Sequence, residues 1–244
     1  MDLTTRTRGV HGANAMDSFD DADALKPTSS GAVQVGGLAL LAGALLFASY
    51  VVARSVITAA AGGDMSAFAR DVMWVPANVA GAIGAALVLL GLPAVYASMA
   101  RGLGRLGLAG VALIAIGWLI LGVFVTLFGA LVAPWLAETA PSLIVPSVAL
   151  PDGLTIALVF GLVATLAGSI LIAIPFLIGR VNPKWIGFMV PLSGIWSVGG
   201  DLAAPTGPAS RLAINLLTNL GPILLVTALA ALGLEAWLRP AATP

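Results

Sequence analysis

The sequence has no cysteine, a single histidine and only two lysines among its 244 residues. Without cysteine the chain forms no disulfide, no thiolate metal site, no S-palmitoylated anchor and no cysteine-based active site. His11 lies in a polar stretch near the N-terminus, so no histidine remains to act as a base or a metal ligand in the apolar part of the chain. Lys26 and Lys184 flank apolar runs, which excludes a retinal Schiff base in the middle of a membrane helix.

Charge is also scarce. Only 9% of the residues are charged, 59% are hydrophobic, the mean hydropathy is +1.05, and eleven basic residues balance eleven acidic ones. No basic patch indicates nucleic acid, and neither a GxxxxGK[ST] phosphate loop nor an HExxH zinc motif is present. With no paired-carboxylate motif either, the sequence argues against an enzyme and predicts neither a metal nor another cofactor.

What the sequence has instead is six long apolar runs. Each contains the roughly 20 residues that a membrane-spanning helix needs, so we expect an all-α polytopic bundle of six transmembrane helices over residues 31–239, with the lipid bilayer as its solvent. Residues 1–30 are expected to form a polar, disordered cytoplasmic tail, and residues 240–244 a short C-terminal tail. The predicted spans are 32–53, 75–99, 103–132, 154–178, 184–204 and 211–234.

The orientation follows from the distribution of lysine and arginine, which accumulate on the cytoplasmic side of membrane proteins. With the N-terminus inside, eight basic residues are cytoplasmic and three are not. The cytoplasmic set is Arg6, Arg8, Lys26, Arg101, Arg105, Arg180, Lys184 and Arg239, and the opposite set is Arg54, Arg70 and Arg211. This bias predicts that both termini are cytoplasmic. The lack of cysteine beside much alanine, glycine and arginine is suggestive of a bacterial genome, which would place the chain in an inner membrane.

Glycine is enriched, at 29 of 244 residues against a usual share of about 7%. Small residues let membrane helices approach closely, so this excess is typical of a tight bundle. Two stripes of small residues recur every four positions: Ala77, Gly81 and Ala85, and then Gly161, Thr165 and Ser169. They predict either contacts within the bundle, the interpretation that six helices favour, or a dimer interface.

Polar side chains gather near the predicted outer face: Arg54, Asn78, Asp201, Arg211, Asn215 and Asn219. Arg211, Asn215 and Asn219 recur every four residues and so form one polar stripe that enters the sixth helix. We expect either interhelical hydrogen bonds, which the stripe alone favours, or an outward-facing ligand site. In that site Asp201 and Arg211 would supply the charges, and Asn78, Asn215 and Asn219 would orient the ligand through their amides.

Several short segments resemble a pattern in uncharacterised multi-pass membrane proteins of bacteria. They are Trp74-Val75-Pro76-Ala77-Asn78, Leu90-Gly91-Leu92-Pro93-Ala94-Val95-Tyr96, Gly104-Arg105-Leu106-Gly107 and Gly179-Arg180-Val181-Asn182-Pro183-Lys184-Trp185. The resemblance implies a six-helix bundle in the plasma membrane, and it assigns no activity and no functional residue. Asn78 stands where this pattern more often has histidine, which argues against a metal or proton role at that position.

Two functional hypotheses follow. The first is a non-catalytic accessory protein that packs its small-residue faces against a partner membrane protein or a second copy of itself. The alternative is a small transporter or permease-like protein with a polar site near the extracytoplasmic face, expected to work as a homo-oligomer because six helices are few for alternating access. A short match between residues 41–46 and 166–171 would suit two inverted halves, although apolar helices also match by chance.

Overall fold

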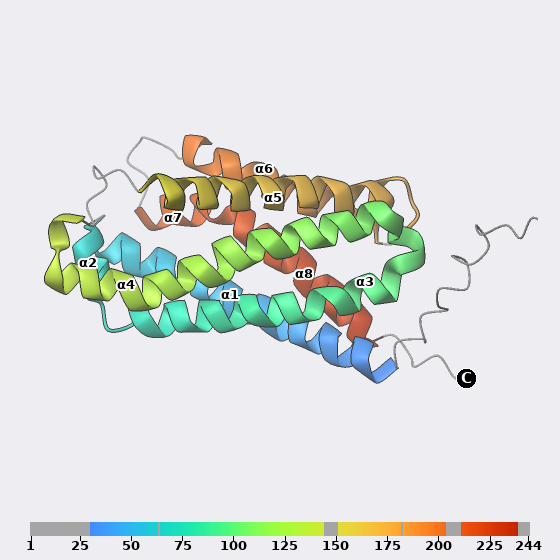
Figure 1. Ribbon diagram of the computed structural model, residues 1–244, viewed down its shortest axis with the longest axis horizontal. Helices are drawn as coiled ribbons and strands as arrows, with labels where there is room; N and C mark the ends of the chain where they lie inside the picture. Colours follow the sequence, from blue (N-terminus) through green and yellow to red (C-terminus); the bar gives the residue numbers. More distant parts are fainter. Residues whose placement is uncertain (1–29, 63, 144–150, 182, 204–210, 239–244) are drawn as a thin grey trace, which may run out of the picture.

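The computed structural model describes residues 30–62, 64–143, 151–181, 183–203 and 211–238. Within these ranges the chain is helical and contains no strand, which confirms the predicted all-α class. The predicted tails, up to residue 29 and over residues 240–244, lie outside the described residues. The long helices run side by side along one axis (Figure 1). In chain order the elements are α1 (Ser30–Ala60), α2 (Met65–Ala69), α3 (Trp74–Trp118), the π-helix η2 (Leu119–Phe124), α4 (Val125–Thr139), the 3₁₀ turn η3 (Pro141–Leu143), α5 (Asp152–Leu177), α6 (Lys184–Ala203), α7 (Arg211–Thr218) and α8 (Leu220–Leu238).

In the part of the chain that the structure describes, four helical stretches are long and apolar enough to cross a membrane: Gly31–Ala60, Trp74–Thr139, Asp152–Leu177 and Leu220–Leu238. Large hydrophobic side chains are exposed along them, among them Leu45, Leu90, Leu131 and Val163. A water-soluble bundle would bury such side chains, whereas a bilayer solvates them. These features support an integral membrane protein.

Two helices continue beyond the predicted spans. α1 extends through Arg54 to Ala60, and α4 extends through Pro134 to Thr139. The segments 55–74 and 133–153, which lie between predicted spans, are therefore partly helical. A hydropathy pattern places an end at the first charge or proline, but neither residue has to end a helix whose backbone hydrogen bonds continue on both sides.

The longest helical stretch, Trp74–Thr139, is a hairpin that reverses at Gly104. Gly104 has φ 58° and ψ −160°, a non-helical backbone conformation that residues with a Cβ atom disfavour. The arm before it (74–103) and the arm after it (105–139) return side by side (Figure 1). The Trp74 indole N–H donates to the Gly129 carbonyl oxygen at 2.8 Å, which joins the far ends of the two arms.

The helices close into a ring. α1 packs on α3 and α8, α3 packs on α5, α5 packs on α6, and α6 packs back on α8. One continuous core runs through the ring, with Leu40, Val88, Ile114, Phe176 and Val226 among its fully buried side chains. The first and last long helices are thus direct neighbours.

Three contacts of this ring are crossings at which glycine faces glycine: Gly43 with Gly84, Gly37 with Gly233, and Gly110 with Gly168. We call these the glycine crossings. At each of the six positions, a Cβ atom would lie 2.6–2.9 Å from a backbone atom of the opposite helix. Backbones this close leave no room for a methyl group, and they gain dispersion and weak Cα–H···O contacts. The glycine excess in the sequence therefore has specific positions to explain it.

The last predicted span is broken into α7 and α8 at Asn219. Pro222 has no N–H, so the carbonyl of Thr218 loses the donor that a continuous helix would supply. The hydroxyl groups within the helices satisfy their own O–H by donating to a carbonyl of the preceding turn, as do Ser49, Ser55, Thr58, Thr126, Thr165 and Thr227. Each hydroxyl thus has an acceptor in its own helix and needs no partner on another helix, although the Thr58 hydroxyl also accepts from the Asn215 amide of α7.

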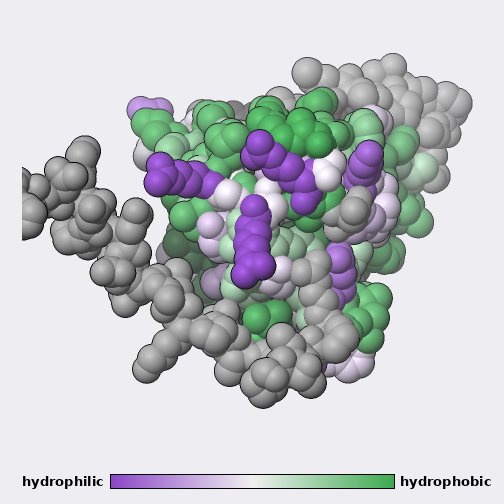
Figure 2. Space-filling view, turned by 90° about the vertical axis from the view of Figure 1, so that its right-hand side faces the viewer, coloured by the Kyte–Doolittle hydropathy of each residue, from purple (hydrophilic) through white to green (hydrophobic). Residues whose placement is uncertain are grey.

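The two ends of the bundle differ in charge. The end with the Gly104 reversal and the α5–α6 turn exposes Arg101, Arg105, Arg180 and Lys184. Figure 2 views this end, where hydrophilic side chains gather beneath a hydrophobic edge. We call it the basic end.

At the opposite end, α2 is fixed to the tip of the hairpin. The Arg70 guanidinium donates to the Ala137 carbonyl oxygen. Asp64 caps α2, and the Ser66 hydroxyl and the N–H groups of Ala67 and Ser66 donate to its carboxylate, which lowers its pKa below the ordinary value. The connection between α1 and α3 is therefore a folded cap over this end.

Candidate functional site

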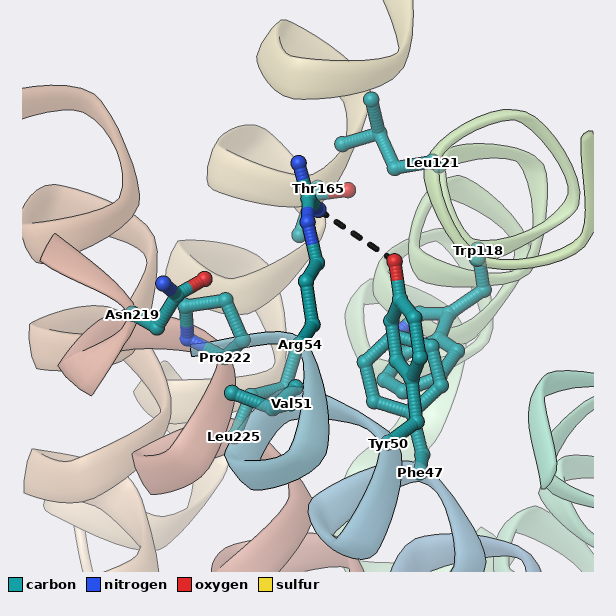
Figure 3. Close-up of a pocket in the computed structure, with 12 residues that line it drawn as sticks. Phe47, Tyr50, Val51, Arg54, Trp118, Leu121, Thr165, Asn219, Pro222 and Leu225 are labelled. Atoms are coloured by element: carbon teal, nitrogen blue, oxygen red, sulfur yellow. Dashed lines mark hydrogen bonds between the residues drawn. The ribbon is translucent and has the colours of Figure 1, made fainter. Parts of the chain in front are cut away.

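A cavity of about 130 Å³ lies between α1 and α5, about two helical turns from the end of α1. α3 and η2 close one side, and the break between α7 and α8 closes the other (Figure 3). Its lining residues come from all of these elements: Phe47, Tyr50, Val51, Arg54, Gly117, Trp118, Leu121, Gly122, Thr165, Asn219, Pro222 and Leu225. We call it the Arg54 cavity.

Arg54 supplies the charged group of this cavity. Because α1 continues to Ala60, Arg54 lies inside the helix, about 9 Å before its end at roughly 1.5 Å per residue. Its side chain is half-buried, and one guanidinium nitrogen donates to the Tyr50 hydroxyl at 3.2 Å. Among the side chains that the structure describes, no carboxylate lies within ion-pair distance of it. A guanidinium so placed is a costly group that retains most of its N–H donors for another acceptor.

An aromatic wall holds Tyr50 in place. The Phe47 ring contacts the Tyr50 ring edge-on with centroids 5.3 Å apart, and it contacts the Trp118 ring at 4.5 Å. All three residues are buried, and Gly81 packs against the Tyr50 ring from behind. The Tyr50 hydroxyl therefore faces Arg54 from a rigid support (Figure 3).

The asparagine stripe crosses from α7 to α1. The Asn215 amide donates to the Thr58 hydroxyl at 2.9 Å and to the Ser55 carbonyl at 3.3 Å. The Asn219 amide donates to the Asn215 carbonyl at 2.7 Å and lies 3.5 Å from the Ser55 hydroxyl. Asn215 thus links two helices, while Asn219 also lines the Arg54 cavity on the side opposite Tyr50 (Figure 3).

The remaining predicted site residues do not join this group in the described structure. Asn78 is buried between the two arms of the hairpin, where its amide donates to the Trp74 carbonyl at 2.9 Å and its oxygen faces Gly129. The backbones of Asp201 and Arg211 belong to α6 and α7, but their side chains lie outside the described residues. Within the described ranges no three His, Cys, Asp or Glu side chains come together to hold a metal.

The sequence placed Arg54 near the outer face but not in the ligand site, and it did not indicate Tyr50, Trp118 or Thr165 as site residues. Tyr50 and Arg54 stand four residues apart on α1, so their shared face was readable from spacing alone. Trp118 and Thr165 come from other helices, and no local pattern brings them to α1.

No protein-family model matches the chain, and neither the curated proteins nor the solved structures contain a match to it. The geometry of the Arg54 cavity is therefore the basis on which a function is proposed.

Proposed function

We propose that the chain crosses a bacterial inner membrane six times with both termini in the cytoplasm. Each arm of the α3–α4 hairpin exceeds the roughly 20 residues that one crossing needs, and α6 has 20 residues. The four exposed cations of the basic end favour a cytoplasmic position for that end. The Arg54 cavity then lies near the extracytoplasmic face.

Because the chain lacks cysteine, single cysteines report this orientation without background. We expect S142C, in the exposed turn η3, to react with a membrane-impermeant maleimide added to spheroplasts, whereas R105C at the basic end reacts only after the membrane is permeabilised. The cysteine-free parent is the control. Labelling of R105C alone in sealed spheroplasts would reverse the orientation.

We further propose that the protein is non-catalytic and binds a small ligand in the Arg54 cavity, in the manner of a small transporter or permease-like protein. The observation that carries this proposal is the cavity itself, which places a guanidinium, a phenol and an amide around a space of about 130 Å³ inside an otherwise apolar bundle. Small-molecule sites have this form, with mostly apolar walls and a few convergent polar groups.

The accessory-protein hypothesis, the first of the two drawn from the sequence, rests on the pair of small-residue stripes. Gly81 packs on Tyr50 of α1, and Gly161 packs on Ile120 and Leu121 of η2. Both glycines are buried within one bundle, so neither offers an open face to a partner.

Two irregularities in the helices also favour a functional cavity. η2 contributes Leu121 and Gly122 to one wall, and the α7–α8 break contributes Asn219 and Pro222 to the other. π-helical turns occur frequently at functional sites, and broken helices in transporters expose backbone where it lines a cavity. The bundle therefore departs from regular helix on both sides of the same space.

Cysteine accessibility tests whether small molecules enter the Arg54 cavity. Thr165 lines the cavity, and Ala164, its neighbour on α5, is 3% exposed and does not. In native membranes we expect the neutral reagent methyl methanethiosulfonate to modify T165C at least tenfold faster than A164C. The readout is the thiol left for a fluorescent maleimide after denaturation.

Equal and slow modification of both cysteines would contradict a ligand-accessible cavity. Unchanged melting temperatures of both variants establish that the comparison concerns the native bundle. The hydrogen-bonding role of Asn215 supplies a further control, since N215A should lower the melting temperature without changing the T165C reaction.

A further inference from the structure

We propose that the ligand of the Arg54 cavity is a small organic monoanion, a carboxylate on an apolar body, held with its carboxylate against the Arg54 guanidinium. This inference rests on the proposed function, because it names the class of molecule that the cavity takes. Charge, hydrogen-bonding geometry and volume each support it.

Arg54 carries a positive charge that is costly inside the bundle. A guanidinium among apolar helices is unfavourable unless an opposite charge or several acceptors compensate it. The described surroundings supply one phenol oxygen to its side chain and no carboxylate. One positive charge pairs best with one negative charge, which favours a monoanion over a dianion such as a phosphate monoester.

The shape of the guanidinium favours a carboxylate as the acceptor. The planar guanidinium presents parallel N–H groups that match the two oxygens of a carboxylate. Tyr50 is fixed by the Phe47 and Trp118 rings, so its hydroxyl can donate to the same anion once the guanidinium turns to the ligand. The Asn219 side chain faces the cavity from the opposite wall (Figure 3).

The volume of the cavity limits the size of the ligand's apolar body. A dry protein cavity of about 150 Å³ binds benzene, and the Arg54 cavity measures about 130 Å³. Phe47, Trp118 and Leu121 give it an apolar wall next to the charged group. A body of about one ring, or a short acyl chain, fits this space.

The test uses three probes of one shape and different charge: benzoate, benzamide and benzamidinium. Each is added to membranes containing T165C before methyl methanethiosulfonate, and the concentration that halves the rate of modification is measured. We expect the half-protecting concentration of benzoate to be at least tenfold below that of benzamide, and benzamidinium to give no protection.

The variants assign this preference to Arg54. In the T165C background, R54Q should raise the half-protecting concentration of benzoate at least tenfold and change that of benzamide less than twofold. R54K keeps the charge without the planar fork and should restore part of the protection by benzoate. Benzamide serves as the folding control, because its protection requires an intact cavity but no cation.

The outcomes separate this inference from the proposed function. Equal protection by benzoate and benzamide, or protection by benzoate that survives R54Q, overturns the anion and leaves the cavity. If methyl methanethiosulfonate fails to modify T165C even without a probe, both the anion inference and the proposed function are overturned. Two further measurements test competing anions. If T165C is modified more slowly in phosphatidylglycerol than in phosphatidylcholine membranes, the occupant is a lipid phosphate. If D201N, in the T165C background, improves protection by benzoate tenfold, Asp201 is the partner of Arg54. Either result overturns the proposal, and its support requires that neither occurs.

Discussion

Replacing Gly43 with alanine is expected to lower the melting temperature of the detergent-solubilised protein by several degrees. A Cβ atom at this position would lie 2.6 Å from the Gly84 carbonyl oxygen and 2.7 Å from the Val88 nitrogen. Both are backbone atoms and cannot rotate away, so α1 and α3 have to separate along their contact. Overpacking of this kind typically costs about 1–3 kcal/mol. Thermal unfolding followed by circular dichroism measures the change.

The matched control is G31A on the same helix. A Cβ atom at Gly31 meets nothing within 4 Å, so alanine there changes only the conformational freedom of the backbone, in the direction that favours the helix. We expect G31A to match or slightly exceed the parent in stability. If G43A is as stable as G31A, α1 and α3 do not cross at Gly43 and Gly84.

Replacing Gly104 with alanine is the second change with a large expected effect, for a different reason. A Cβ atom at Gly104 also meets nothing within 4 Å, so packing predicts no cost. The cost comes from φ 58° with ψ −160°, which is almost exclusive to glycine and costs about 1–3 kcal/mol for other residues. We expect G104A to lower the melting temperature, as measured by thermal unfolding.

Two comparisons isolate this backbone effect. Gly153 is equally open around its Cβ position but has no positive φ, so G153A should leave the melting temperature unchanged or raise it. Asparagine tolerates the left-handed helical region, but ψ at Gly104 lies far outside it, so G104N should be no better than G104A. A G104A protein as stable as G153A would mean that the hairpin reverses with another backbone conformation.

The sequence predicted the helical elements well because apolar runs of sufficient length leave a backbone in lipid few alternatives to helix. The fifth predicted span, 184–204, begins where α6 begins, and α6 is described as far as Ala203. The ends of α1 and α4 were predicted too early because Arg54 and Pro134 resemble the ends of spans in a hydropathy pattern. Whether a helix ends at such residues depends on the hydrogen bonds around them, which composition does not describe.

The candidate site was predictable only in part, since spacing gives the face of one helix but not the neighbour that the face meets. Asn215 and Asn219 were expected on one stripe, and the structure places both beside Ser55 and Thr58 of α1. The stripe alone did not distinguish a helix contact from a lining residue, and the two asparagines divide between these roles. Trp118 reaches the cavity because the chain reverses at Gly104, and the sequence around Trp118 does not predict this position.

The crossing of Gly37 with Gly233 has a consequence for biogenesis. It joins the first long helix of the chain to the last, so α1 enters the membrane well before the helix that covers its glycine face has been synthesised. Until then, the glycine face of α1 is available to the α8 of any neighbouring nascent chain. Premature termination of synthesis before α8 would leave the glycine face of α1 permanently uncovered. Exchange of α8 between two chains would cover this face in both of them and produce a dimer.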